Sequence, residues 1–458
     1  MRYLVSRKTA ALAFTVIVAA FASFSSAAEG ADGAFMLEMA MDRDPAIYKV
    51  GETAHVRVRL FEAGRPVGGK KAFCSWNYAD SNVVEIAEEG TTIALKLDRP
   101  GQVLLRGDLY DGTNRLRGVT ADNPKVRSLY IWAGALFEPE KVKVERARPA
   151  DFDAYWEGEI ARMKREAPLS SAKVEVQEVK SAKKGFRVFD VTIPGLPPRP
   201  TCGYLVVPEG AAPKSLPALV MFQGAGSSRA VKEYHDGMLF FCINPHGVGN
   251  EAPKADWKAY FASDGKDYLY KDWHDREKCF FHGQILRTVR GLEWLKTRPE
   301  WNGRDLVVRG VSMGGSQSLQ AAALDPDVTL CLPRDPALCD LAGIVSSTHN
   351  RSGCPWILYS PRNLPSLQGA KAEVDPVLLA NSDYYDSIFF ASRIKCPTFV
   401  STGLADDVCF SEGVFKMYNA LGGQKDMETN PHAIHCGSSN PRADEALRAL
   451  AAPAARRN

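Results

Sequence analysis

The sequence predicts an α/β protein preceded by a smaller all-β domain. At 458 residues, the chain is longer than one hydrophobic core usually supports, so two domains are expected. From residue 29 onward, apolar and polar residues alternate in short runs, which is the period of half-buried strands. From about residue 138, short apolar runs alternate instead with stretches of helical periodicity. Strands that alternate with helices indicate a mostly parallel sheet covered on both faces.

The composition is that of an ordinary globular protein, with 45% hydrophobic and 24% charged residues. The formal net charge of +3 is too small to favour nucleic acid or an anionic membrane as a partner. Ten cysteines are scattered through the chain without a CxxC pair, so a zinc or redox site has little support. We therefore expect no nucleic-acid partner, and the sequence leaves the oligomeric state open.

Residues 1–28 have the order of a secretory signal peptide. Three basic residues among the first eight precede an apolar run over 10–24, and the small residues 25–28 follow. The apolar run is shorter than the roughly 20 residues that a membrane span needs, and no later segment is long and apolar enough to span. We expect a secreted protein, periplasmic or extracellular, with cleavage after Ala28.

The segment 29–137 is predicted to be a small β-sandwich. Val56, Val58 and Leu60 alternate with arginines, and similar alternation recurs near residues 93–97, 103–105 and 129–131. Several short strands at regular spacing are typical of a sandwich. Nothing in this segment indicates catalysis.

The segment 138–458 is predicted to alternate strands and helices. Its apolar strands and one-sided helices fall at 152–163 (helix), 219–222 (strand), 285–295 (helix), 306–308 (strand) and 398–400 (strand). In such a sheet, reactive loops lie at the carboxyl ends of the strands.

The strongest chemical motif is a serine between two glycines. Gly310-Val311-Ser312-Met313-Gly314 follows the strand 306–308 and precedes a helical run. A nucleophile on a sharp strand-to-helix turn projects into solvent, and its strained backbone tolerates only small neighbours. The motif therefore predicts that Ser312 is the nucleophile of an α/β-hydrolase catalytic domain. Together with the segment 29–137, the predicted fold is an α/β-hydrolase catalytic domain preceded by a small β-sandwich domain.

A serine hydroxyl needs a base and an orienting acid, and in this fold they follow in the order Ser, acid, His. Asp406 and Asp407 come just after the strand 398–400, where the acid belongs. His432 and His435 are the last histidines of the chain. Position alone does not separate the members of either pair.

The oxyanion formed in acyl transfer needs two backbone N–H donors. Met313, at the start of the helix behind the serine, supplies one in this prediction. Ala225 supplies the other, from the short turn Gly224-Ala225-Gly226 after the strand 219–222.

Several motifs in order give the chain a family resemblance. From about Gly134 to Arg442 it resembles the acetyl xylan esterase and cephalosporin-C deacetylase family of carbohydrate esterases, and especially secreted members with an N-terminal immunoglobulin-like domain. The resemblance is carried by Arg148–Trp156, Gly224–Gly226, Asn244-Pro245-His246-Gly247, Arg298–Gly303 and Gly403–Cys409, and by Ile434-His435-Cys436. It implies Asp406 as the acid and His435 as the base.

The chain departs from the family pattern at three places. Met313 stands where the family usually has Gln, Phe410 and Ser411 stand where it has two prolines, and Ile434 replaces the Gly before the final His. The first change matters little if only a backbone N–H is used. Together they concern the substrate pocket more than the catalytic residues.

The resemblance implies hydrolysis of O-acetyl groups on carbohydrate, namely acetylated xylan or xylo-oligosaccharides, through an acyl-enzyme on Ser312. This chemistry needs no metal or organic cofactor. Trp273 and Trp356 are candidates for stacking on a sugar, although a tryptophan is more often packed in the core. Cys409 and Cys436 adjoin the acid and the histidine, so a disulfide between them is a further hypothesis.

The sequence leaves open whether the sandwich serves only in oligomer contacts, and two other functions also remain open. One is a hydrolase of the same fold that acts on another ester or on a peptide, because fold does not fix substrate. The other is a carbohydrate-binding protein that uses the sandwich and carries an inactive hydrolase domain. An intact set of Ser, Asp and His argues against the second.

Overall fold

A computed structural model describes residues 35–77, 80–120, 123–226, 228–343 and 375–452. The predicted signal peptide and Trp356 lie outside these residues. The chain divides into two compact units, one formed by residues up to 98 together with 103–135, and one formed by 99–102 together with 136 onward. We call them the β unit and the α/β unit. The short segment Arg99–Gln102 belongs to the α/β unit, although it lies inside the β region in sequence.

The β unit consists of two six-stranded sheets, and its described residues contain no helix. The sequence alternation has the expected effect, because Val56, Val58 and Leu60 are all fully buried while Arg57 is exposed. The first sheet has the order β11-β10-β1-β3-β4 with β7 beside β3, and the second has the order β2-β12-β8-β5-β6 with β9 beside β8. The strands are β1 (Phe35–Met41), β2 (Ile47–Tyr48), β3 (Ala54–Glu62), β4 (Arg65–Pro66), β5 (Lys70–Trp76), β6 (Asp80–Ile86), β7 (Thr91–Leu95), β8 (Gly101–Asp111), β9 (Asn114–Arg115), β10 (Arg117–Thr120), β11 (Asn123–Ser128) and β12 (Tyr130–Phe137).

The α/β unit is built on one nine-stranded sheet of order β13-β14-β15-β17-β16-β18-β19-β20-β21. The pairs from β13 to β17 are antiparallel, and all pairs from β17 to β21 are parallel. The sheet is therefore more mixed at its first edge than the sequence predicts. The strands are β13 (Glu175–Val179), β14 (Phe186–Ile193), β15 (Thr201–Pro208), β16 (Leu216–Phe222), β17 (Leu239–Ile243), β18 (Trp301–Val311), β19 (Leu330–Arg334), β20 (Thr398–Gly403) and β21 (Lys425–Asn430).

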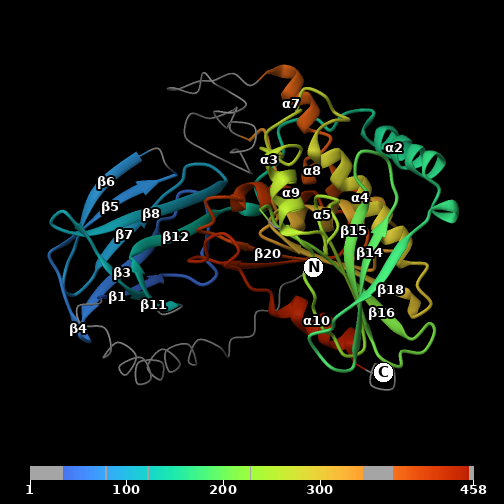
Figure 1. The fold of residues 1–458 in the computed structure, drawn as a ribbon. Coiled ribbons are helices and arrows are strands. Elements are labelled where there is room, and N and C mark those ends of the chain that lie inside the picture. The colour runs from blue at the N-terminus through green and yellow to red at the C-terminus, as the bar shows by residue number, and fades with distance from the viewer. Residues whose placement is uncertain (1–34, 78–79, 121–122, 227, 344–374, 453–458) are drawn as a thin grey trace. The chain divides into compact units, whose positions relative to one another are not determined.

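Helices cover both faces of this sheet. Because successive residues of a strand point to opposite sides, neighbouring strand residues belong to two different cores. One core contains Val220 and Val308 together with residues of the helices α2, α4, α5, α8 and α9. The opposite core contains Leu219 and Val307 together with Leu447 of α10 (Figure 1). The helices are α2 (Phe152–Glu166), α3 (Lys254–Ala262), α4 (Phe280–Leu295), α5 (Met313–Leu324), α7 (Pro376–Ser382), α8 (Ser387–Ala391), α9 (Ser411–Ala420) and α10 (Pro441–Ala451), with short 3-10 turns η1 (Pro139–Lys141) and η2 (Leu169–Ser171).

The parallel strands end at a common edge, and this edge collects the chemistry-bearing residues. The turn after β16 carries Ala225, the turn after β18 carries Ser312, and β20 leads to Asp406. Asp335 follows β19, which lies between β18 and β20. Within the described part of the chain, no helix is both long and apolar enough to cross a bilayer.

Candidate active site

The turn at Ser312 has a strained backbone that only small neighbours permit. Ser312 has φ 58° and ψ −122°, a conformation that L-residues rarely adopt. A Cβ on Gly310 would lie 2.2 Å from the carbonyl oxygen of Gly314, and a Cβ on Gly314 would lie 2.1 Å from the carbonyl oxygen of Phe222. Both distances are far inside van der Waals contact, so glycine is required at both positions. The turn holds the serine between β18 and the first residue of α5.

Ser312, His435 and Asp406 form a hydrogen-bonded chain. The Oγ atom of Ser312 lies 3.0 Å from Nε2 of His435, and Nδ1 of the same ring lies 2.8 Å from Oδ2 of Asp406. Asp406 is fully buried, whereas the His435 side chain is 20% exposed. Of the two acids and two histidines that position left open, Asp406 and His435 are the members brought to Ser312. This arrangement can remove a proton from a hydroxyl nucleophile.

The electrostatics of His435 suit a base that becomes positively charged. Burial acts to lower the pKa of His435, but the hydrogen bond and negative charge of Asp406 outweigh it and raise the pKa above its ordinary value. Asp406 is itself fixed, because its Oδ1 accepts hydrogen bonds from the N–H groups of Val408 and Cys409, both at 2.8 Å. The carboxylate can therefore hold one ring tautomer and stabilise the imidazolium.

The turn after β16 lies beside the serine. A Cβ on Gly224 would come within 3.6 Å of the Cβ of Ser312. Met313 is the first residue of α5, and the first N–H groups of a helix have no partner within the helix. The Ala225 turn is held in place through its neighbour, because the N–H of Gly226 donates to the hydroxyl of Tyr268 at 2.9 Å. The two predicted oxyanion donors thus come from elements that flank Ser312.

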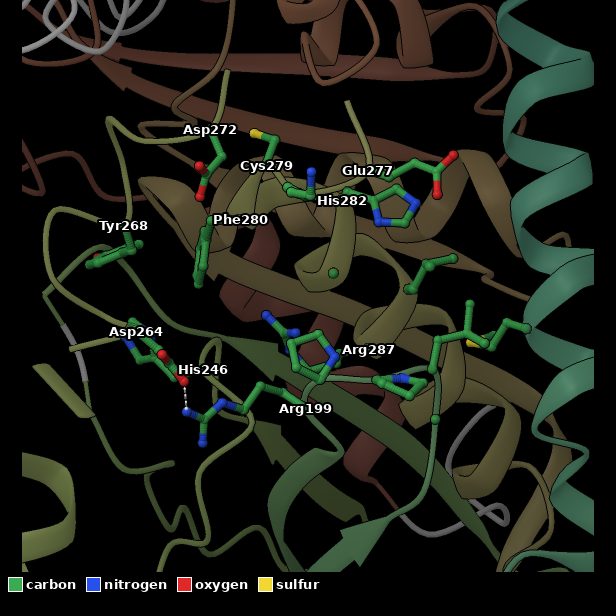
Figure 2. A pocket seen from close by; sticks show the side chains of 18 of the residues that line it. Arg199, His246, Asp264, Tyr268, Asp272, Glu277, Cys279, Phe280, His282 and Arg287 are labelled. Atoms are coloured by element: carbon green, nitrogen blue, oxygen red, sulfur yellow. Dashed lines mark hydrogen bonds and ion pairs between the residues drawn. The ribbon is translucent and has the colours of Figure 1, made fainter. Parts of the chain in front are cut away.

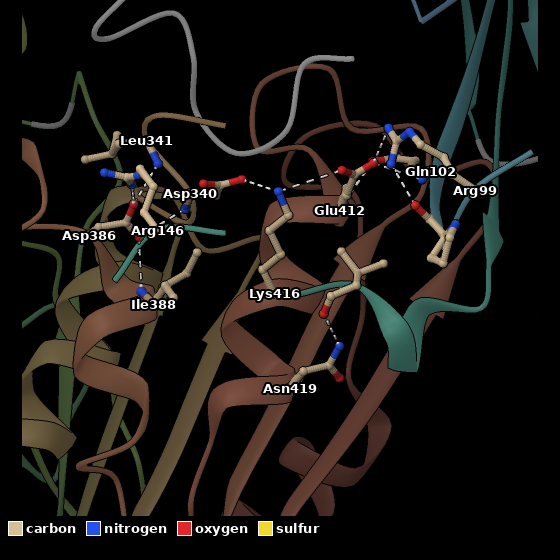
Figure 3. A network of polar contacts seen from close by, with 12 residues as sticks. Arg99, Gln102, Arg146, Asp340, Leu341, Asp386, Ile388, Glu412, Lys416 and Asn419 are labelled. Atoms are coloured by element: carbon tan, nitrogen blue, oxygen red, sulfur yellow. Dashed lines mark hydrogen bonds and ion pairs between the residues drawn. The ribbon is translucent and has the colours of Figure 1, made fainter. Parts of the chain in front are cut away.

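A buried polar network supports the loop that carries Asp406 (Figure 3). The side-chain amide of Gln102 donates to the carbonyl oxygen of Leu404 at 2.7 Å, and its oxygen accepts from the N–H of Glu412 at 3.0 Å. The Glu412 carboxylate accepts from the backbone N–H of Gln102 at 3.2 Å and from Arg99 at 3.3 Å. Gln102 and Glu412 are 3% and 5% exposed. The acid loop is therefore tied to a segment that lies about 300 positions earlier in sequence.

Sequence reasoning missed Asp335, Tyr268 and Gln102 as supports of the site. Asp335 is fully buried, and its carboxylate accepts the N–H of Gly403 at 2.9 Å. Burial and the nearby charge of Asp406 raise the pKa of Asp335 to about 6. Its position directly after a parallel strand was a signal that could have found it. Tyr268 and Gln102 carry no comparable sequence signal.

Asp406, Cys409 and His435 form a group that could hold a metal ion, since their donor atoms lie within 4.8 Å of one another. However, Asp406 and His435 already use the facing atoms in a hydrogen bond of 2.8 Å. A metal bound to these atoms would replace the contact that orients the imidazole. The set is therefore better suited to orienting the base than to holding a metal.

Two sequence hypotheses need correction. The prediction that Trp273 stacks on a sugar is wrong, because its side chain is 1% exposed and its ring packs against Phe281 and Tyr385 in the core. The Cys409–Cys436 disulfide is also absent, since both residues are thiols. Buried aromatic packing and loop geometry are tertiary properties that the local sequence does not reveal.

The sequence and the fold resemble those of known esterases. Acetyl esterase Axe7A of Xylanibacter ruminicola is 27% identical over 410 residues, which are 86% of this chain and 85% of that protein. An acetyl xylan esterase from Paenibacillus sp. R4 matches with a TM-score of 0.55 and 24% identity, over 69% of this chain and 98% of that chain. Acetyl xylan esterase 1 from Thermoanaerobacterium sp. JW/SL YS485 matches with a TM-score of 0.55 and 22% identity, over 69% and 97% of the two chains.

The sheet order, the strained serine turn and these structural neighbours define the α/β-hydrolase fold. The chain belongs to the acetyl xylan esterase (AXE1) family, whose model matches residues 134–451. The protein is therefore a carboxylic ester hydrolase. The predictions of fold class, family and enzyme class are confirmed.

Proposed function

We propose that this protein is a secreted serine esterase that removes O-acetyl groups from carbohydrate, with acetylated xylan or xylo-oligosaccharides as substrate. The observation that carries the proposal is the chain of hydrogen bonds from Ser312 through His435 to Asp406, in a member of the acetyl xylan esterase family. The acetyl substrate is supported by the family and by the related acetyl esterase of Xylanibacter ruminicola. Secretion rests on the signal-peptide pattern of residues 1–28.

The reaction proceeds in two halves. His435 takes the proton of Ser312 as the serine oxygen attacks the acetyl carbonyl carbon, and Asp406 stabilises the imidazolium. The tetrahedral intermediate collapses when the bond between the carbonyl carbon and the sugar oxygen breaks and His435 gives that proton to the sugar oxygen, which leaves as a hydroxyl group. A water molecule then attacks the acetyl-serine with His435 again as the base, and acetate leaves.

The oxyanion of each tetrahedral intermediate is bound by the N–H groups of Ala225 and Met313. One such donor contributes about 3 kcal/mol of transition-state stabilisation in comparable sites. The helix α5 adds the positive end of its dipole at the same place. Because only backbone N–H groups are used, Met313 replaces the family's glutamine without loss of this contribution.

The test is acetate release from acetylated xylo-oligosaccharides by the mature chain and by Ser312→Ala. We expect release by the parent and a fall in kcat of about 10,000-fold or more in the variant. Ser318→Ala is the matched control, since the Ser318 hydroxyl donates to the carbonyl oxygen of Gly314 one turn earlier in the same helix. Its activity should stay close to that of the parent.

Other results would change the proposal in defined ways. Cleavage of a simple aryl acetate but not of the oligosaccharide would keep the serine mechanism and remove the xylan substrate. Cleavage of another acyl ester or a peptide bond would redirect the proposal to a different hydrolase. Absence of cleavage of every ester, with binding of the oligosaccharide, would favour a carbohydrate-binding protein.

A further inference from the structure

A large pocket in the α/β unit lies apart from Ser312 (Figure 2). Its volume is about 910 Å³, within the size range of small-molecule sites. The lining comes from the end of α2, the loop 195–201, the region 260–279 and one side of α4. Neither Ser312, His435 nor Asp406 is among the lining residues.

Among the described residues, one buried cation of the pocket has no counter-charge. Four arginines line it, and three of them pair with carboxylates: Arg162 with Glu159, Arg199 with Asp264, and Arg290 with Glu293. The fourth, Arg287 on α4, makes no ion pair with a carboxylate among the residues that the structure describes. Its Nη2 donates to the carbonyl oxygen of Pro245 at 2.7 Å, and its buried Nε has no hydrogen-bond partner among those residues.

Arg287 remains charged in this position. Its side chain is buried, with 8% of the residue exposed, and burial lowers its pKa to about 10. At neutral pH the guanidinium is therefore still protonated. A buried charge is costly unless a charge of opposite sign or several hydrogen bonds compensate it. The positive charge of Arg199 lowers the pKa of Arg287 further and adds no compensation.

The wall around this guanidinium leaves room for a ligand. A Cβ on Gly283, one turn earlier on α4, would come within 2.9 Å of Nη1 of Arg287, so the absence of a side chain there keeps this nitrogen open. Asp264 and Asp272, two of the carboxylates that line the pocket, are exposed, whereas Arg287 is buried. Figure 2 shows Arg199, His246 and Arg287 on one side of the pocket, opposite Cys279 and His282.

An aromatic cluster forms the adjoining wall. The rings of Tyr260, Tyr268 and Phe280 surround the imidazole of His246, with centroids 5.3, 4.8 and 5.5 Å from it. The guanidinium carbon of Arg287 lies 5.8 Å from the centre of the Phe280 ring. A planar cation beside aromatic faces suits a carboxylate attached to a ring, because the fork binds the carboxylate and the faces bind the ring.

We infer that this pocket is a second binding site, which takes a small carboxylate-bearing ligand on the guanidinium of Arg287. The carboxylate has two sources that share this chemistry. One is a sugar acid, which would also use the aromatic wall. The other is acetate, which is the product of the proposed reaction. The site is distinct from Ser312, and its ligand binding does not depend on the esterase proposal.

The test is isothermal titration of the mature full chain with D-glucuronate, with acetate and with D-glucose as the neutral sugar. We expect at least one of the two carboxylates to bind and glucose not to bind. Tighter binding of glucuronate assigns a sugar acid, and equal or tighter binding of acetate assigns the small anion. Absence of binding by both carboxylates, or equal binding of glucose and glucuronate, would overturn the inference.

Two variants place the binding in this pocket. Arg287→Gln removes the charge, and Gly283→Ala keeps the charge but fills the space beside Nη1. Alanine is favourable inside a helix, so Gly283→Ala gives a second test if Arg287→Gln fails to fold. Either folded variant should weaken carboxylate binding at least tenfold. Unchanged affinity in the folded variants would place the carboxylate elsewhere and overturn the inference.

Discussion

Two regions of the α/β unit bury charge, and they balance it differently. One region is the edge where the parallel strands end, which we call the catalytic edge. There the fully buried Asp406 carboxylate accepts hydrogen bonds from His435 and from two backbone N–H groups. In the pocket beside α4, the buried guanidinium of Arg287 makes one hydrogen bond, to a carbonyl oxygen, within the described part of the chain. The first charge is compensated by the chain itself, and the second is not.

The difference teaches how buried charge can be used. A carboxylate with three fixed partners keeps one position, which is what the proposed role of His435 as the base requires. A guanidinium without a counter-charge is stabilised when an anion arrives from outside. Tyr268 belongs to both regions, since it lines the pocket and its hydroxyl binds Gly226 beside the predicted oxyanion donor.

The largest expected effect comes from removing the buried negative charge of Asp406. Asp406→Asn should lower kcat by about 10,000-fold, because the amide no longer favours the tautomer and the charge that His435 needs. The pKa of His435 should also fall, since the hydrogen bond to Asp406 is the largest of the contributions that raise it. The acidic limb of the kcat–pH profile, which requires neutral His435, should therefore move to lower pH.

Asp407→Asn is the matched control for that variant, because the carboxylate that lies 2.8 Å from Nδ1 of His435 is that of Asp406. It should retain nearly full activity. Equal losses in Asp406→Asn and Asp407→Asn, or an acidic limb that does not move, would contradict the assignment of the acid.

The serine turn and the strands at the catalytic edge could be predicted from sequence because their signals are local. The glycines around Ser312 are required by contacts within the turn and with the adjacent strand end, and apolar runs mark the buried strands. The choice of Asp406 and His435 needed the family motifs, because position alone allowed Asp407 and His432. Local pattern and family motif together were enough for the three residues of the hydrogen-bonded chain.

The supports of the site could not be predicted, because each depends on contacts between distant segments. Gln102 and Leu404 are 302 positions apart, and Gly226 and Tyr268 are 42 apart. The same limit explains the wrong interpretation of Trp273, whose burial depends on Phe281 and Tyr385. The uncompensated state of Arg287 also becomes visible only when its surroundings are known.

A smaller effect is expected from the second carboxylate at the catalytic edge. The pKa of Asp335 is raised from 3.8 to about 6, so its ionised form destabilises the fold. This penalty is small below pH 3.8, grows between pH 3.8 and about 6, and levels off above that at about 3 kcal/mol by the usual conversion of a pKa shift. Asp335→Asn removes the ionisation and can still accept the N–H of Gly403.

The measurement is the free energy of unfolding by urea between pH 4 and pH 8. Asp335→Asn should match the parent near pH 4 and exceed its stability at pH 7 to 8. The exposed Asp236→Asn should differ from the parent by less than about 0.5 kcal/mol throughout. If the free energy of unfolding depended on pH in the same way for Asp335→Asn and the parent, the ionisation of Asp335 would not destabilise the fold. This result would contradict the prediction.

The smallest effect that we predict tests the residue shared by the two regions. Tyr268→Phe removes the hydroxyl that accepts the N–H of Gly226 but keeps the aromatic wall of the pocket. The turn that carries Ala225 should then hold its N–H less firmly, so kcat should fall about tenfold, less than the loss of a direct oxyanion donor. Tyr234→Phe is the matched control, because the Tyr234 hydroxyl likewise accepts a backbone N–H, from Ala182 at 3.0 Å. Steady-state kinetics should show the loss in kcat only for Tyr268→Phe, while titration with glucuronate should give the parent's affinity. Equal kcat values for the two variants would mean that the Tyr268 hydroxyl does not position the turn that carries Ala225, and would contradict this prediction.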